Sequence, residues 1–322
     1  MTWLIMGGAG YIGAHVARAL KGAGSEVVAL DDLSTGYAER LPADIPLVEG
    51  SAHDSALLKR VFAEYGVSGV VHLAALKQVA ESVAKPTRYY EENVGGLARL
   101  LEATGEAGIT RFLFSSSAAV YGNPDVDLIT EATACAPVNP YGETKLAGEW
   151  LVRAAGRAHG IATVCLRYFN VAGAGAPELA DRGVFNIVPM VFDRLTRDEE
   201  PRIFGADYPT PDGTCVRDYI HVADLAEAHL AAARRLESDA SGDLTVNIGR
   251  GEGVSVRELI AVIGEVTGER RAPVIEGRRL GDAPRAVASA ERAAAELGWN
   301  ARLGVREMVE SAWRGWRLHQ GA

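Results

Sequence analysis

The chain has 322 residues, of which 48% are apolar and 23% charged, and its formal net charge is −9 at pH 7. This composition supports a full hydrophobic core and excludes a largely disordered chain. The length predicts one large or two modest domains. The acidic balance and the lack of a basic run argue against a nucleic-acid-binding surface.

The three cysteines, Cys135, Cys165 and Cys215, are widely spaced and form no Cys-x-x-Cys pair. We interpret them as reduced thiols and expect a cytoplasmic protein. No apolar run is as long as a membrane span, and we predict no nucleic-acid, membrane or metal partner. The first residues lack a basic segment and lead directly into a glycine-rich turn, so they predict a strand and not a signal peptide.

The glycine-rich turn, GGAGYIG at 7–13, joins a predicted strand at 3–6 to a helical pattern over 14–23. Its glycines fit both G-x-G-x-x-G and G-x-x-G-x-x-G. With a strand before it and a helix after it, the motif indicates a dinucleotide site. The backbone N–H groups of such a turn approach a pyrophosphate at the helix N-terminus, where the helix dipole favours anions.

The second predicted strand, 26–30, ends in Asp31 and Asp32. That is the expected distance for the acid that binds an adenosine ribose. A carboxylate there accepts a hydrogen bond from a free 2′-hydroxyl and repels a 2′-phosphate. Because no arginine follows within the next several residues, we predict NAD rather than NADP.

Strands and helices then alternate. Further strands are predicted at 46–48, 67–75, 111–115 and 162–166, and helices at 56–65 and 87–108. The run at 67–75 is almost continuously apolar, as in a parallel strand buried on both faces; we interpret His72 within it as a core imidazole. The serines at 115–117 follow a strand, where open α/β sheets place their ligands. The alternation predicts a Rossmann-like, doubly wound parallel sheet with right-handed crossovers.

A helix is predicted to begin at Asn139-Pro140, since asparagine caps helices and proline fits the first turn. Tyr141 and Lys145 then share one face of this helix. An ammonium near a phenol favours the phenolate and lowers its pKa, and a tyrosine with such a pKa can exchange a proton with a sugar hydroxyl. Alone, Tyr-x-x-x-Lys is a weak pattern.

After residue 172 the alternation breaks into a segment rich in glycine, proline and aspartate. The elements predicted beyond it are a helix at 188–197, a strand from 216 leading into a helix that ends at 236, a strand at 245–248, and helices at 255–264 and 289–297, each opened by a serine. We expect an NAD-binding Rossmann domain over 1–172, to which the chain returns around 216–248. A smaller, interleaved α/β substrate domain is expected over 173–322.

The chain resembles the extended short-chain dehydrogenase/reductase superfamily and, within it, the UDP-glucose (UDP-galactose) 4-epimerases. The matching stretches are GGAGYIG at 7–13, DDLSTG at 31–36, LAALKQVAES at 73–82, FSSSAAVYG at 114–122, NPYGETK at 139–145, LRYFNVAGA at 166–174, IFGADYPTPDGTCVRDYIHVADLA at 203–226 and RRLGD at 278–282. The nucleotide and Tyr/Lys motifs specify the superfamily, whereas the 203–226 block and the Leu-Lys pair at 76–77 are more specific to epimerases.

The resemblance implies the catalytic residues Ser117, Tyr141 and Lys145: Ser117 bonds the reacting sugar hydroxyl, Tyr141 is the acid/base, and Lys145 holds the nicotinamide ribose and lowers the Tyr141 pKa. The implied NAD site comprises Gly7, Gly10, Tyr11, Ile12, Gly13, Asp31, Asp32, Ser51, Ala52, Leu73, Ala74, Ala75, Lys77, Asn93, Ser115, Tyr141, Lys145 and Tyr168. The implied UDP-sugar site comprises Lys77, Ser117, Tyr141, Asn170, Asn186, Ile203, Phe204, Arg217, Tyr219, Arg279, Asp282 and Ala286.

Two positions carry specific expectations. Ser51 replaces an acid that usually contacts adenine in the family, which puts adenine affinity in question. Ala286 lies where the family lines the space beside the C2 substituent of the sugar, and its small side chain predicts room for an N-acetyl group.

The implied reaction is reversible epimerisation of UDP-hexoses at C4, in which hydride leaves and returns through a 4-keto intermediate on resident NAD. Rival interpretations are another nucleotide-sugar enzyme (4,6-dehydratase, decarboxylase or pentose 4-epimerase), an alcohol dehydrogenase that exchanges NAD, and a non-catalytic NAD-sensing protein. Dehydratases carry an acid pair where this chain has Ala118 and Ala119, and sensing proteins typically lack the tyrosine or lysine.

The resemblance also implies a homodimer that pairs helices 87–108 and 142–159. The apolar residues that we expect to offer surface for this pairing are Leu97, Leu100, Leu101, Leu146, Trp150 and Leu151.

Overall fold

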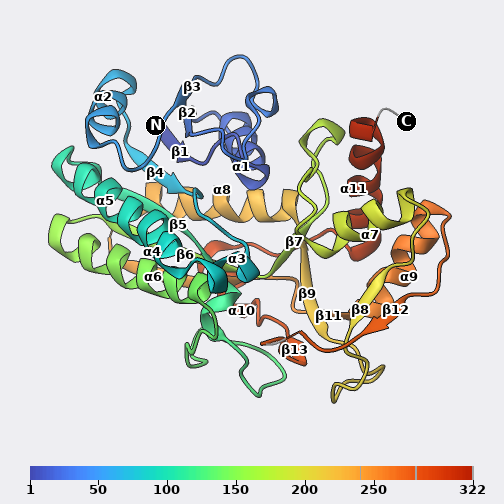
Figure 1. Cartoon of the computed structure of the whole chain (residues 1–322). Coiled ribbons are helices and arrows are strands. Elements are labelled where there is room, and N and C mark those ends of the chain that lie inside the picture. The colour runs from blue at the N-terminus through green and yellow to red at the C-terminus, as the bar shows by residue number, and fades with distance from the viewer. Residues whose placement is uncertain (240, 280, 321–322) are drawn as a thin grey trace.

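The computed structural model describes residues 1–239, 241–279 and 281–320. Leu280, inside the RRLGD motif, lies outside the described residues, as do Ala240 and the last two positions of the predicted 173–322 domain. One large and two small β-sheets organise the chain (Figure 1).

The large sheet has seven strands, all parallel, in the order β10-β6-β5-β4-β1-β2-β3. The strands are β1 (Thr2–Met6), β2 (Glu26–Asp31), β3 (Leu47–Glu49), β4 (Gly69–His72), β5 (Arg111–Ser117), β6 (Ala162–Tyr168) and β10 (Asp243–Ile248). This confirms the predicted doubly wound fold. The strand order reverses between β1 and β4, and ligands of such sheets bind outside the carboxyl ends at that point.

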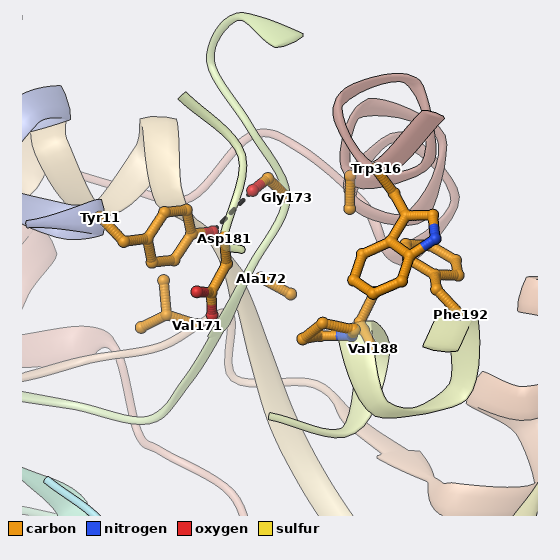
Figure 2. Close-up of a pocket in the computed structure, with 10 residues that line it drawn as sticks. Tyr11, Val171, Ala172, Gly173, Asp181, Val188, Phe192 and Trp316 are labelled. Carbon is orange, nitrogen blue, oxygen red and sulfur yellow. Dashed lines mark hydrogen bonds between the residues drawn. The ribbon is translucent and has the colours of Figure 1, made fainter. Parts of the chain in front are cut away.

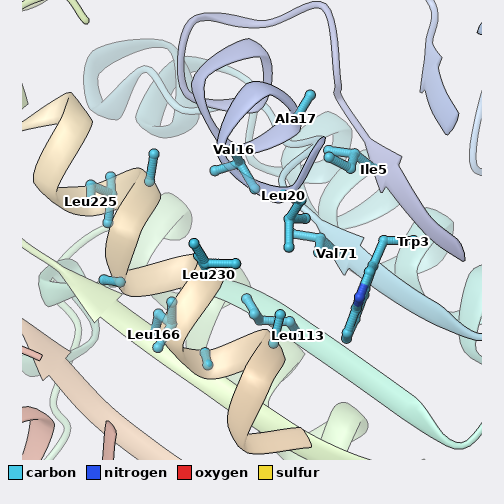
Figure 3. Close-up of a cluster of buried hydrophobic side chains, with 14 of the residues drawn as sticks. Trp3, Ile5, Val16, Ala17, Leu20, Val71, Leu113, Leu166, Leu225 and Leu230 are labelled. Atoms are coloured by element: carbon cyan, nitrogen blue, oxygen red, sulfur yellow. The ribbon is translucent and has the colours of Figure 1, made fainter. Parts of the chain in front are cut away.

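Helices cover both faces of this sheet. One face carries α1 (Tyr11–Gly22), α8 (Val222–Ser238) and α10 (Glu291–Leu297), and the other carries α2 (Ser55–Tyr65), α5 (Gly96–Glu106) and α6 (Pro140–His159). Figure 3 shows the first interface, where Val16 and Leu20 of α1 and Leu225 and Leu230 of α8 meet side chains of the strands. Burial on both faces explains the continuous apolar runs in the strands.

The helix predicted at 87–108 is present but less regular than expected. It consists of α4 (Pro86–Tyr90), a π-helical turn η2 (Glu91–Gly95) and α5, and a short helix α3 (Val79–Ala84) that we did not predict precedes it. The π turn contains Asn93, so the irregular segment coincides with a predicted site residue, as is frequent for π turns.

The dimer prediction is wrong for part of its surface. Leu97, Leu100 and Leu101 are fully buried against the parent sheet, Leu146 is buried, and Leu151 packs on the same core. Trp150, in contrast, is 59% exposed on α6. Val79, Val83 and Tyr90, on the neighbouring helices α3 and α4, are also exposed.

A second layer of structure follows β6. A four-stranded sheet joins β7 (Asn170–Ala172), β9 (Val216–His221), β11 (Gly253–Ser255) and β13 (Arg285–Ala286), and β8 (Arg202–Phe204) pairs with β12 (Val274–Glu276). The helices are α7 (Ile187–Thr196), α9 (Val256–Thr267) and α11 (Val305–Gln320), of which α11 was not predicted. Short 3₁₀ turns are η1 (Ala38–Arg40), η3 (Ala118–Tyr121) and η4 (Pro177–Leu179). The helices α7, α9 and α11 share a hydrophobic core with β7, β8 and β9.

We expected the chain to return to the Rossmann domain around residues 216–248, and the pairing of β9 shows where it does so. β9 belongs to the smaller sheet, and the chain rejoins the large sheet with α8 and β10. Ser255 caps α9 in a reciprocal capping box with Glu258, as predicted. The prediction that Ser289 opens a helix is wrong, because α10 begins at Glu291 and Ala290 precedes it. Among the described residues, no helix is long and apolar enough to cross a membrane.

Candidate active site

The predicted site residues converge on the carboxyl edge of the large sheet. β1 leads into the glycine turn, β4 into residues 73–77, β5 ends at Ser117 and β6 ends at Tyr168. These four strands are neighbours in the sheet, so segments far apart in the sequence meet at one edge.

The glycine turn is too tight for side chains. A Cβ on Gly13 would lie 2.0 Å from the Gly7 carbonyl oxygen, and Gly7 itself has φ of +79°. Gly10 precedes α1 without any side-chain cap, and no acidic residue lies in the first turn. The first N–H groups of α1 are therefore available to an anion. Ile12 packs partly into the core.

Asp31 lies at the end of β2, beside this turn. Its carboxylate accepts hydrogen bonds from the Ala9 N–H at 2.9 Å and the Leu33 N–H at 2.9 Å. Burial raises the pKa of Asp31, and these backbone donors oppose the rise. Asp32 is exposed, and Ser51 accepts from the His53 N–H at 3.2 Å. Of the two acids, Asp31 is the one fixed next to the glycine turn.

Asn93 holds the segment after β4 in place. Its side chain accepts from the Leu76 N–H at 2.8 Å and donates to the Leu76 carbonyl at 2.9 Å and to Thr144 Oγ1 at 3.1 Å. The neighbouring Lys77 side chain is exposed. Asn93 therefore fixes the backbone that presents Lys77. Leu73, Ala74, Ala75 and Ala52 are all partly exposed.

The start of α6 brings Tyr141 to Ser117. Asn139 Oδ1 accepts from the Gly142 N–H at 2.9 Å and Pro140 occupies the first turn, which confirms the predicted helix start. A hydrogen bond with Ser117 lowers the pKa of the Tyr141 phenol, although burial raises that pKa by more. The Ser117 hydroxyl thus lies near the buried Tyr141 phenol.

Lys145 is buried one turn after Tyr141. Its Nζ donates to the Ser115 carbonyl at 2.8 Å and lies 6.0 Å from the centroid of the Tyr141 ring. Burial lowers the pKa of Lys145 to about 8, and Glu149 opposes that shift. The expected lowering of the Tyr141 pKa by Lys145 is not seen in this structure, because desolvation of the phenol dominates.

Beneath the site lies a buried polar layer in which the predicted residues Ser115 and Tyr168 meet residues absent from the predicted site: His229, Glu149 and Arg167. The Ser115 hydroxyl lies 3.0 Å from His229 Nε2, and Tyr168 packs near the same imidazole. Burial raises the pKa of Tyr168. Glu149 and Arg167 form a buried ion pair at 2.6 Å. Arg167 stands inside the motif at 166–174, and Glu149 follows Lys145 by four positions. These were the only sequence signals for the pair.

Tyr11 begins α1, as expected, but its side chain makes a contact that the sequence did not predict. Its hydroxyl donates to the Gly173 carbonyl at 2.6 Å, and it lines a small closed cavity with Asp181 and Trp316 (Figure 2). Burial raises the pKa of Tyr11. The side chain therefore ties α1 to the segment after β7.

Several predicted UDP-sugar residues lie on strands of the smaller sheets: Asn170, Ile203, Phe204, Arg217, Tyr219 and Ala286. Arg217 of β9 donates to the Ala283 carbonyl at 2.7 Å and is 3.4 Å from Asp282 Oδ1. Tyr219, on the same strand, is buried, and Asn170 pairs opposite it in the sheet and is exposed. The Arg217 guanidinium is thus partly engaged by contacts within the protein.

The remaining residues of this group divide into accessible and buried ones. The Arg279 guanidinium lies 3.6 Å from the centroid of the Phe204 ring, which forms a cation–π pair. Asn186 donates to Asp181 Oδ2 at 2.8 Å. Ile203 lies in the hydrophobic core, so its side chain cannot contact a ligand, and only its backbone remains available.

Ala286 is partly exposed on β13. It packs against the cluster that contains Val120, Leu146 and Phe169, together with Ala118. The next residue, Val287, is fully buried, with its side chain next to Gly253. Val287 therefore does not fill the space beside Ala286.

Comparison with known proteins places this geometry in a family. The family model described as "NAD dependent epimerase/dehydratase family" matches residues 3–249. The UDP-glucose 4-epimerase of Azospirillum brasilense is 47% identical over 92% of this chain and 86% of its own length. The Streptomyces lividans UDP-glucose 4-epimerase is 44% identical over 97% and 94%. A crystal structure of the UDP-glucose 4-epimerase from Stenotrophomonas maltophila, with bound NAD and formylated UDP-arabinopyranose, is 37% identical, has a TM-score of 0.95 and covers 100% of both chains.

Proposed function

Because the chain belongs to the NAD dependent epimerase/dehydratase family, we propose that it catalyses the NAD-dependent epimerisation of UDP-hexoses at C4, from UDP-galactose to UDP-glucose and back. The observation that carries this proposal is the convergence of Tyr141, Ser117 and Lys145 at the end of β5, where Lys145 Nζ donates to the Ser115 carbonyl at 2.8 Å and Ser117 lowers the pKa of Tyr141. UDP-glucose 4-epimerases match the chain over nearly its whole length.

The residues at the sheet edge fit NAD. The turn at 7–13 has no space for a Cβ at Gly13, α1 begins without a side-chain cap, and Asp31 is fixed beside both. A pyrophosphate suits the free N–H groups, and a ribose with an unmodified 2′-hydroxyl suits the carboxylate. Lys77, Lys145 and Tyr168 would hold the phosphates, the nicotinamide ribose and the nicotinamide face. Ser51 would bond adenine through its hydroxyl.

Bound NAD⁺ supplies the hydride acceptor. Tyr141 takes the proton from the sugar 4-hydroxyl and later returns it, and Ser117 bonds the same hydroxyl. Burial raises the pKa of Tyr141, so the positive charge of Lys145 is needed to favour the phenolate during proton transfer. Lys145 is suited to this role because its Nζ makes only one hydrogen bond within the described residues.

The UDP part would be held by Asn170, Asn186, Phe204, Arg217, Tyr219, Arg279 and Asp282, with the backbone of Ile203. Guanidinium groups bind phosphates through paired N–H donors. The sugar meets fewer polar groups, mainly Ser117 and Tyr141. A firm grip on UDP and a loose grip on the sugar would allow the sugar to present either face of C4 to the hydride carrier while its C4 oxygen stays within reach of Tyr141.

The rival activities are less well supported. Ala118 and Ala119 form the 3₁₀ turn directly after Ser117, so no acid is available there for dehydration. Tyr141 and Lys145 are both present and positioned, unlike the substitutions expected of a non-catalytic sensing protein. We further infer an NAD-binding domain over 1–172 and an interleaved substrate domain over 173–322, a homodimer, and a cytoplasmic location consistent with three free cysteines.

The experiment that separates this function from an exchanging dehydrogenase examines the protein as purified. Acid-released nucleotide should contain NAD in nearly stoichiometric amount, and UDP-galactose should be converted without added NAD. Release of NADP as the main species would overturn the cofactor assignment, and turnover that depends on added NAD would favour the dehydrogenase.

A further inference from the structure

The carboxyl end of β5 is held from both faces of the large sheet. On one face, the Ser115 hydroxyl meets His229 of α8 at 3.0 Å. On the other face, the Ser116 hydroxyl donates to Glu149 Oε1 of α6 at 2.6 Å. The next residue, Ser117, bonds Tyr141. The anchors at 115 and 116 therefore determine where the Ser117 hydroxyl lies.

Glu149 makes further hydrogen bonds that connect α6 to other elements around the site. The carboxylate is fully buried and receives Arg167 Nε at 2.8 Å and Nη2 at 2.6 Å, a bidentate pair. Arg167 directly precedes Tyr168 on β6, and its Nη1 donates to the Tyr121 hydroxyl at 2.8 Å. Through these bonds, one carboxylate joins α6 to the ends of β5 and β6.

Lys145 and Glu149 are one helical turn apart and bind successive residues of β5. Lys145 holds the Ser115 carbonyl, and Glu149 holds the Ser116 hydroxyl. A buried ion pair is weak support for stability, since apolar replacements of similar volume often serve as well. The buried carboxylate is therefore better explained by positioning its neighbours and supplying a negative charge than by stabilising the fold.

Glu149, one helical turn along α6, acts on the charge of Lys145. His72, at the end of β4, is neutral because burial lowers its pKa to about 3. Burial raises the pKa of both Tyr141 and Tyr168, so neither is charged near neutral pH. Arg167 and Arg153 both lie on Glu149, at 2.6 and 3.6 Å. Within the described part of the chain, the charge of Glu149 raises the Lys145 pKa.

Building on the proposed function, we propose that Glu149 is a positioning residue of the active site: it fixes Ser117 through Ser116 and provides the negative charge that keeps Lys145 protonated. Glu149 touches neither substrate nor cofactor in this account. It acts through the two residues that do.

The test compares three variants with the parent enzyme. Ser116→Ala removes one hydrogen bond and no charge, and we expect kcat to fall about tenfold or more with little change in KM, because small displacements of reacting groups are costly. Glu149→Gln should show the same fall and, in addition, titrate Lys145 about one pH unit lower, since an anion one turn away is lost. The titration is followed by NMR of lysine labelled with ¹³C at Cε and assigned with Lys145→Met.

Val152→Ala, on the same helix, is the matched control, since it removes buried methyl groups and no polar contact. It should lower Tm while leaving kcat and the Lys145 titration unchanged. If Glu149→Gln does not fold, Glu149→Gln/Arg167→Met removes both buried charges and takes its place.

The proposal is overturned if Ser116→Ala keeps kcat within about twofold of the parent, well short of the expected loss, or if Lys145 titrates unchanged in the Glu149 variant. Equal effects from Val152→Ala would also overturn it. An inactive parent would refute the proposed function instead, while the NMR titration would still decide whether Glu149 sets the charge of Lys145.

Discussion

Lys145 Nζ donates a 2.8 Å hydrogen bond to the carbonyl of Ser115, which lies in β5 two residues before Ser117. Two groups of the proposed reaction, the Ser117 hydroxyl and the Lys145 ammonium, are therefore fixed to the same strand end. The protonation of Lys145 can therefore be tested by a pH–rate profile, and proton transfer by Tyr141 can be tested separately by substitution.

Activity should decline on the alkaline side as Lys145 loses its proton. Burial lowers the pKa of Lys145 from 10.5 to about 8, so the ammonium is present below about pH 8 and is lost above it. Because the charged form supports the phenolate, kcat/KM should fall as the pH rises through that value. A pH–rate profile from pH 6 to pH 10 measures this, and a flat profile across that range would contradict the assignment.

Tyr141→Phe should abolish turnover and leave UDP-sugar binding nearly intact. The variant removes the one proton route to the 4-hydroxyl and preserves the ring, and general acid–base groups contribute about 10²–10⁴-fold to rate. Tyr90→Phe is the control, since its hydroxyl bonds only Glu143 on the surface. The assignment fails if Tyr141→Phe loses less than about tenfold in kcat.

Substrate breadth tests the position of Ala286. The small side chain leaves the space beside the sugar C2 substituent open, and the buried Val287 does not close it. We expect interconversion of UDP-GlcNAc and UDP-GalNAc as well as of UDP-glucose and UDP-galactose. Ala286→Tyr should lose the N-acetyl substrates alone, because a packed pocket cannot take the extra atoms without strain. Native activity on UDP-GalNAc below about a thousandth of that on UDP-galactose, a larger gap than ordinary pocket fit produces, would refute this prediction.

The protein should be a homodimer at micromolar concentration, with Trp150 in the interface. This side chain is 59% exposed, and Val79, Val83 and Tyr90 on the neighbouring helices α3 and α4 are exposed as well. Trp150→Glu should give a monomer by light scattering, because it places a charge in the proposed interface. Leu318→Glu, an equally exposed apolar position on α11, should remain dimeric. A parent mass equal to the monomer would disprove the dimer itself.

Much of the fold could be predicted because local signals agreed with the tertiary structure. The apolar strands, the glycine turn and the Asn139-Pro140 helix start each depend on neighbouring residues, and each was found where expected. The short strands β7, β8 and β11 to β13 were not predicted, since two or three residues carry no periodicity. α11 was not predicted, although its buried residues Met308, Val309, Ala312 and Trp316 follow helical spacing.

The site was predictable as a set of residues but not as an electrostatic system. The sequence predicted that Lys145 lowers the Tyr141 pKa, whereas burial raises it. Burial depends on elements distant in the chain, as does the pairing of Glu149 with Arg167, which joins α6 to β6. The leucines of the predicted dimer face likewise have helical spacing that does not distinguish the parent sheet from a partner.

The most direct test of C4 epimerisation follows the fate of the hydrogen on C4. UDP-galactose deuterated at C4 is incubated with the purified protein without added NAD, and the product is examined by NMR. We predict UDP-glucose that retains deuterium at C4, because the hydride is removed and returned within one active site. Product without the label, or no UDP-glucose at all, would contradict the account.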